Sequence, residues 1–116
     1  MMFTESINTR HEIFKFFPAF REVAPDISKE EIEIFMMVAT TEGLCMGDIG
    51  KALGFAVSTT SRYFKNLSDI RSRTEPGYGL LHNYRDPQNN RRRLVVLTLN
   101  GRKLYERILG EKVLES

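Results

Sequence analysis

The sequence has few of the residues and patterns that identify secreted, zinc-binding or membrane proteins. It holds one cysteine, Cys45, and two histidines, His11 and His82, which offer neither an internal disulfide nor the ligand spacing of a zinc site. Its longest apolar run, Ile34 to Ala39, is far shorter than the roughly 18 residues that span a bilayer. The N-terminus lacks the basic start and apolar stretch of a signal peptide. We therefore expect a soluble, cytoplasmic protein with no metal, no cofactor and no membrane partner.

The composition is that of a single globular domain. The chain has 116 residues, of which 41% are hydrophobic and 28% charged, so it can bury one core. Its net charge of +2 is unevenly distributed, because residues 1–56 hold five basic and nine acidic residues whereas residues 57–116 hold 12 basic and six acidic. The second half is suited to an anionic partner, although charge alone does not distinguish nucleic-acid binding from a solvated surface.

Residues 1–25 form an aromatic N-terminal segment with helical spacing. The apolar stripe contains Ile7, His11, Phe14, Phe17 and Phe20, with Phe16 beside it. Pro18 predicts either a kink or the start of a second short helix, because proline lacks an amide donor and clashes with the preceding turn. The aromatic surface either covers the core or meets a second subunit.

Residues 28–73 have the pattern of a helix followed by a helix-turn-helix, which we place at 46–73. Ser28 and Glu31 have capping-box spacing and start a helix that ends at Gly43. The inner face of that helix is expected to hold Ile32, Phe35, Met36, Val38 and Ala39. A short helix from about Gly47 to Leu53 and a glycine turn precede a helix that begins at about Val57. Its predicted inner face is Val57, Thr60, Phe64, Leu67 and Ile70, and its outer face is Ser58, Thr59, Arg62, Lys65 and Asn66.

Residues 80–98 predict a β-hairpin, or wing, and residues 99–114 a closing helix. The strands are expected at Leu80–Arg85 and Arg92–Thr98, with residues 86–90 at the tip. Thr98 has the position of an N-cap, and Leu104 and Ile108 are the expected inner residues of the helix. The predicted fold class is mainly α (α+β), a winged helix-turn-helix.

A family resemblance rests on these motifs. The stretch Leu44-Cys-Met-Gly-Asp-Ile-Gly-Lys-Ala-Leu-Gly-Phe-Ala-Val-Ser-Thr-Thr-Ser-Arg-Tyr-Phe-Lys-Asn-Leu67 is followed by Gly79-Leu-Leu, Asp86-Pro, Arg91 and Val95-Val-Leu-Thr-Leu-Asn-Gly101. Together they resemble the MarR family of winged-helix transcription regulators over residues 30 to 108. The resemblance implies a dimer that places the recognition helix in the major groove of DNA and the wing on the adjacent minor groove.

The chain departs from the family pattern at several positions. Family members usually have Ser at Ala56, Pro at Val57 and Asp at Asn89, where the carboxylate commonly orients Arg91. About eight extra residues separate Leu67 from Gly79, and the apolar period predicts that they prolong the recognition helix to Arg73, where Arg71 and Arg73 would contact the DNA backbone. The last helix is short for a family that dimerises through long terminal helices.

Ten polar side chains are the candidate DNA contacts. They are Ser58, Thr59, Arg62, Lys65 and Asn66 on the recognition helix, and Arg85, Asn90, Arg91, Arg92 and Arg93 on the wing. Arginine can grip guanine through two hydrogen bonds, and hydroxyls suit phosphate or thymine-methyl contacts. Because strand residues alternate, we expect Arg91 and Arg93 on one face and Arg92 on the other.

The sequence therefore favours a cytoplasmic, homodimeric transcription regulator that binds double-stranded DNA. No nucleophile, base or paired-carboxylate constellation predicts catalysis, and Cys45 is expected to be a small buried residue at a helix start. One alternative is a winged-helix module that docks a polymerase or replication protein. Another is single-stranded nucleic-acid binding through Tyr63, Tyr78 and Tyr84.

Overall fold

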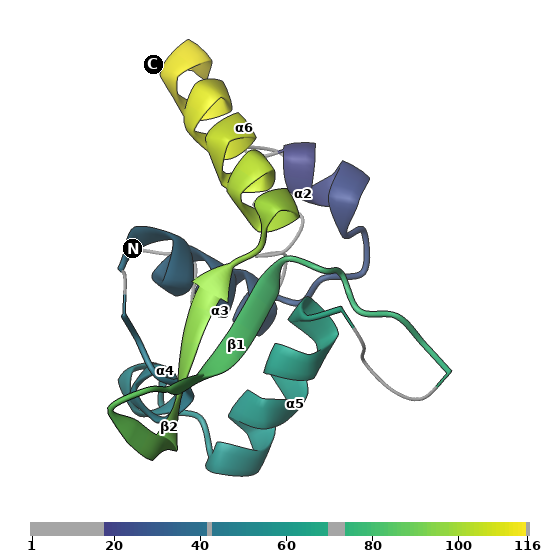
Figure 1. Cartoon of the computed structure of the whole chain (residues 1–116). Coiled ribbons are helices and arrows are strands. Elements are labelled where there is room, and N and C mark those ends of the chain that lie inside the picture. The colour runs from purple at the N-terminus through teal and green to yellow at the C-terminus, as the bar shows by residue number, and fades with distance from the viewer. Residues whose placement is uncertain (1–17, 42, 70–73, 116) are drawn as a thin grey trace.

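The computed structural model describes residues 18–41, 43–69 and 74–115 (Figure 1). The helices are α2 (Pro18–Val23), α3 (Lys29–Thr40), α4 (Met46–Leu53), α5 (Val57–Leu67) and α6 (Leu99–Glu115), and the strands are β1 (Leu81–Asp86) and β2 (Asn89–Leu97). The two strands form one antiparallel hairpin. This order confirms the predicted mainly α winged-helix fold.

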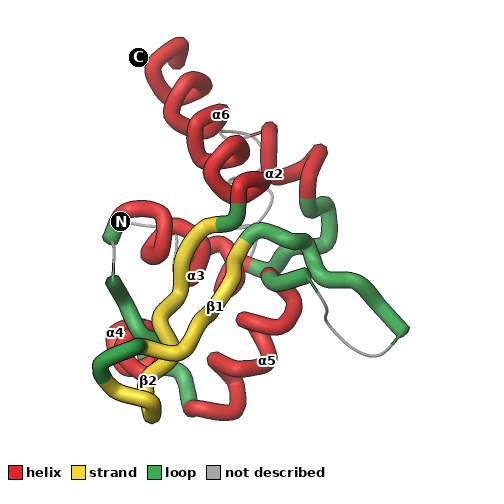
Figure 2. Tube along the Cα trace, in the orientation of Figure 1, coloured by secondary structure: helices red, strands yellow, loops and turns green. Residues whose placement is uncertain are grey.

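The hairpin lies between two groups of helices. Strand β2 packs against α3, α4 and the start of α6, while α4 and α3 both pack against α5. At the opposite end, α2 lies beside α6, which extends away from the rest of the domain (Figures 1 and 2). The hairpin tip and the end of α6 therefore point in opposite directions.

One core joins every described element. Phe20 of α2 meets Phe35 of α3 edge to face, with ring centroids 5.7 Å apart. The other large, fully buried side chains are Ile27, Ile34, Ile49, Leu67, Leu80, Leu81, Val95, Leu104 and Ile108. The predicted burial of Leu104 and Ile108 is confirmed, whereas Met36 and Ala39 are only half-buried.

The helix start predicted at Ser28 is confirmed. The Ser28 hydroxyl accepts from Glu31 N at 3.1 Å, and Glu31 Oε1 accepts from Ser28 N at 2.9 Å, which is the reciprocal capping box. Pro18 is the first described residue of α2, and the residues before it lie outside the described ranges, so the choice between a kink and a new helix stays a prediction. The remaining N-terminal phenylalanines lie outside the described residues, as do Ile7 and His11.

The predicted extension of the recognition helix to Arg73 is wrong, because α5 ends at Leu67 and Ser68 is extended. The chain returns alongside this end: Tyr78 N donates to Asn66 O at 2.9 Å and Leu80 N to Leu67 O at 2.8 Å. These carbonyls would have accepted the next helical hydrogen bonds, so bonds from the returning segment take the place of another helical turn. Residues 70–73, with Arg71 and Arg73, lie outside the described residues.

The hairpin tip is tighter than predicted. Asp86 pairs with Asn89, which leaves Pro87 and Gln88 as a two-residue turn, and β2 begins at Asn89 instead of Arg92. Arg85 pairs with Arg93, so residues 90–92 form an irregular, bulged stretch on β2 with no register partner on β1. The simple alternation of Arg91, Arg92 and Arg93 therefore does not apply.

The N-cap predicted at Thr98 is confirmed and joins α6 to the chain that follows α5. Its hydroxyl donates to Gly79 O at 2.7 Å and accepts from Gly101 N at 2.9 Å. Gly101 itself lies so close to the Leu80 carbonyl that a Cβ atom there would overlap the oxygen. The first turn of α6 is thus fitted to the backbone at Leu80.

We predict opposite effects for the same substitution at two glycines of α6. Gly101→Ala should lower the free energy of unfolding by about 1–3 kcal/mol, because the new methyl group meets rigid backbone. Gly110→Ala has nothing within 4 Å of its Cβ, and should raise that free energy by about 0.5–1 kcal/mol. Urea unfolding followed by circular dichroism measures both, and equal effects would contradict the close approach at Leu80.

Candidate nucleic-acid interface

The turn between α4 and α5 follows from two local features. Gly54 takes the left-handed conformation, with φ 77°, and ends α4, while Phe55 N donates to Gly50 O at 2.8 Å. Ala56 is extended and leads directly into α5 without a side-chain cap. Gly50 faces Thr60 so closely that a Cβ atom would lie 2.6 Å from its hydroxyl oxygen, so glycine permits the close helix contact.

The outer face of α5 is largely as predicted. Thr60, Phe64 and Leu67 are buried, and the exposed side chains are Val57, Ser58, Arg62 and Lys65. Thr59 is half-buried. Val57 was expected inside and is instead 85% exposed. It occupies the first turn, before the stretch in which α5 covers the core.

Asn66 does not lie on the outer face. It is half-buried, and its Nδ2 donates to Glu31 Oε2 at 2.6 Å. Glu31 is only 4% exposed and already accepts from Ser28 through its other oxygen. Asn66 therefore links α5 to the start of α3, and its amide is already engaged there, unlike the other candidate contacts on α5.

The two cations on α5 have different surroundings. The Arg62 guanidinium carbon lies 5.4 Å from the centroid of the neighbouring Tyr63 ring. The centroid of the Tyr63 ring lies 5.6 Å from that of Phe55, so Phe55 packs against the ring that the Arg62 guanidinium contacts. Lys65 is exposed and has no ion-pair partner within the described part of the chain.

The wing is joined to α4 by side chains as well as backbone. Arg92 Nη2 lies 3.6 Å from Asp48 Oδ2. A hydrogen bond from the Cys45 thiol, and then the Arg92 charge, lower the pKa of Asp48 below its ordinary value, while Cys45 and Asp48 raise the pKa of Arg92. Cys45 is half-buried, at the predicted helix start, and pairs with Leu94 through the backbone. Arg92 is therefore partly neutralised, which sequence spacing alone did not indicate.

The other candidate contacts on the wing are exposed. Arg93 Nη1 donates to Asn83 Oδ1 at 3.1 Å, and Arg85 faces Arg93 across the hairpin. The Asn89 side chain accepts from Arg91 N at 3.1 Å, so it fixes the Arg91 backbone in the bulge. The Arg91 guanidinium has no ion-pair partner among the residues that are described. Asn90 is also exposed.

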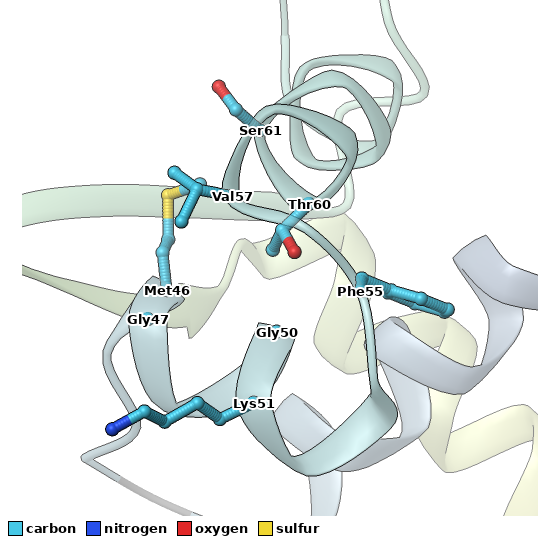
Figure 3. Close-up of a pocket in the computed structure, with 8 residues that line it drawn as sticks. All are labelled: Met46, Gly47, Gly50, Lys51, Phe55, Val57, Thr60 and Ser61. Carbon is cyan, nitrogen blue, oxygen red and sulfur yellow. The ribbon is translucent and has the colours of Figure 1, made fainter.

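A small pocket lies between α4 and α5 (Figure 3). It has a volume of about 220 Å³ and is lined by Met46, Gly47, Gly50, Lys51, Phe55, Val57, Thr60 and Ser61.

Within residues 18–41, 43–69 and 74–115, no cluster of three or more His, Cys, Asp or Glu side chains could hold a metal ion. No helix in the same ranges is long and apolar enough to cross a membrane. The exposed candidate contacts on α5 and the wing therefore offer cations, a hydroxyl group and the Asn90 amide.

Comparison with known proteins finds similarity in structure. No family model matches the sequence, and no curated protein matches it. The S. aureus MepR–DNA complex shares 27% identity over 88% of this chain and 77% of MepR, with a TM-score of 0.68. PcaV from Streptomyces coelicolor shares 22% identity over 91% of this chain and 72% of its own, with a TM-score of 0.62. MarR shares 16% identity over 94% and 72%, with a TM-score of 0.68.

We predict that the link between Asn66 and Glu31 stabilises the fold. Asn66→Ala should lower the free energy of unfolding by about 1–3 kcal/mol, because it leaves a buried carboxylate oxygen without its donor. The neighbouring Lys65→Ala, at an exposed position, should change that free energy by less than about 0.5 kcal/mol. Chemical unfolding of both variants tests this, and a neutral Asn66→Ala would show that water replaces the amide.

Proposed function

We propose that this chain, which has the winged-helix fold of MarR-type transcription regulators, binds double-stranded DNA sequence-specifically and regulates transcription. The observation that carries the proposal is the fixed attachment of an arginine-rich wing to α4, the helix that also packs against α5. Two cationic elements are thereby held at a constant spacing. The similarity to MepR in a complex with DNA supports duplex DNA as the ligand.

The proposed binding mode uses α5 and the wing differently. Helix α5 lies in the major groove, where Arg62 is placed to contact a guanine edge and Lys65 a phosphate. Ser58 and Thr59 begin the helix and suit backbone contacts. Arg91, at the bulge of the hairpin, extends to the adjacent phosphates or minor groove. Arg92 contributes less, since Asp48 already partly neutralises it.

We further propose that the protein acts by binding alone, without a cofactor, in the cytoplasm. The similar solved structures are transcription regulators, which supports a non-enzymatic role. Binding to single strands is less well supported, because it requires stacked aromatic rings. Tyr63 packs against Phe55, and Tyr78 and Tyr84 belong to other segments of the chain, so the three rings do not follow one another along one helix or strand.

Three alanine variants test how the cations divide their roles. Arg91→Ala should weaken binding to every duplex and reduce the slope of log affinity against log salt by about 0.9, because one phosphate contact is lost. The matched variant Arg92→Ala should reduce that slope less, since Arg92 is paired with Asp48. Arg62→Ala should mainly reduce discrimination between a selected site and random duplex, by about 1–3 kcal/mol.

These values come from binding isotherms of wild type and variants on a selected duplex, a random duplex and a random single strand across a salt series. Wild-type preference for the single strand would reject the duplex proposal. Binding by Arg62→Ala and Arg91→Ala that equals the wild type would favour the protein-docking alternative.

We propose that the chain is a homodimer that uses α6 and the N-terminal segment. Leu109 on α6 is 44% exposed and Val23 on the adjacent α2 is 39% exposed, so both leave apolar area open on the end that extends from the domain. Sedimentation equilibrium at micromolar concentration should give twice the 13.4 kDa chain mass. Leu109→Asp should shift the chain toward monomer while circular dichroism shows that it still folds, and a monomeric wild type would contradict the proposal.

A further inference from the structure

Val57 is an exposed apolar side chain for which the polar contacts above give no role. It is the first residue of α5 and is 85% exposed, although a valine in water leaves apolar area unburied. Ser58 follows it directly, and Arg62 and Lys65 are exposed further along the same helix. An apolar group is therefore presented at the start of the surface that otherwise carries hydroxyls and cations.

Val57 also forms one wall of the pocket between α4 and α5 (Figure 3). The Met46 side chain extends toward Val57 from the start of α4, and Phe55 lies on the far side of the pocket. The Thr60 hydroxyl, which faces the pocket, already donates to Ala56 O at 3.0 Å. The pocket therefore presents mostly apolar contacts to a group that enters it.

The size of the pocket limits what can enter. At about 220 Å³ it is smaller than the roughly 300–1,000 Å³ of sites that enclose small-molecule ligands. A single apolar substituent fits, whereas a cofactor does not. Lys51 lies at the edge and points outward, so a cation is available to an anionic group beside the entering substituent.

Duplex DNA presents one such apolar substituent in the major groove, the 5-methyl group of thymine. The first residues of a recognition helix are the ones that meet base edges there. We infer that Val57, with Met46 behind it, reads the 5-methyl group of a thymine while Lys51 faces a neighbouring phosphate. This inference rests on the proposed DNA-binding function and adds to it a residue that determines specificity.

Single-methyl deletion in the DNA tests the inference. The probe is a duplex selected by the wild-type protein from a random pool, in which each thymine is replaced in turn by deoxyuridine. One replacement should weaken wild-type binding about fourfold, which is the equivalent of about 0.8 kcal/mol for one buried carbon group. Val57→Ala should bind the thymine and deoxyuridine probes within about 1.5-fold of each other, because the partner of the methyl group is gone.

Leu99→Ala is the matched control, because Leu99 is also an exposed apolar residue at a helix start, 68% exposed, but on α6. It should retain the fourfold sensitivity, and both variants should melt at the wild-type temperature. The inference is overturned if Val57→Ala keeps the wild-type sensitivity or if no thymine is sensitive. In those cases selection still recovers a preferred duplex, so the proposed function stands and Val57 is available to a protein partner. A wild type that selects no duplex overturns both.

Discussion

The arrangement of this domain depends on a short backbone pairing between the start of α4 and the second strand of the wing. Val95 N donates to Leu44 O at 2.9 Å, and Cys45 forms an isolated bridge with Leu94. Because Cys45 immediately precedes α4, this pairing fixes the hairpin to the helix-turn-helix at the point where α4 begins. A wing held only by its own turn would sample many angles, whereas hydrogen bonds to backbone restrict it to one.

The buried Glu31 carboxylate fixes the C-terminal end of α5 against α3. Glu31 caps α3 through Ser28 and accepts from Asn66, so the first turn of α3 and the last turn of α5 share one charged group. A buried carboxylate carries a desolvation cost that these hydrogen bonds must offset, so the loss of one donor is costly although the intact group adds little net stability. The carboxylate also orients α5. Its bond to Asn66 forms only when α5 has one rotation about its own axis, and with that rotation Arg62 and Lys65 face outward.

The features predicted from sequence were those set by neighbouring residues. The capping box at Ser28, the glycine end of α4 and the N-cap at Thr98 each depend on positions within four residues, and all are present. The misplaced features depend on distant partners. Helix α5 stops at Leu67 because Tyr78 and Leu80 bond its last two carbonyls. Asn66 turns inward because Glu31, 35 positions earlier, accepts from its amide. Periodicity describes one helix and carries no information about the chain that packs against it.

The same distinction separates formal charge from charge that is available to DNA. The wing has four arginines, but Asp48 lies beside Arg92 and Asn83 accepts from Arg93, whereas Arg91 keeps its guanidinium without an ion-pair partner in the described ranges. Arg92 must give up or share the Asp48 carboxylate before it binds phosphate, so part of its Coulomb gain is already used, whereas the neutral Asn83 amide only orients Arg93. The pairing also holds Arg92 beside α4. The wing thus divides its cations between maintaining its own position and facing an anion, and affinity for DNA should follow the second group more closely than the total charge.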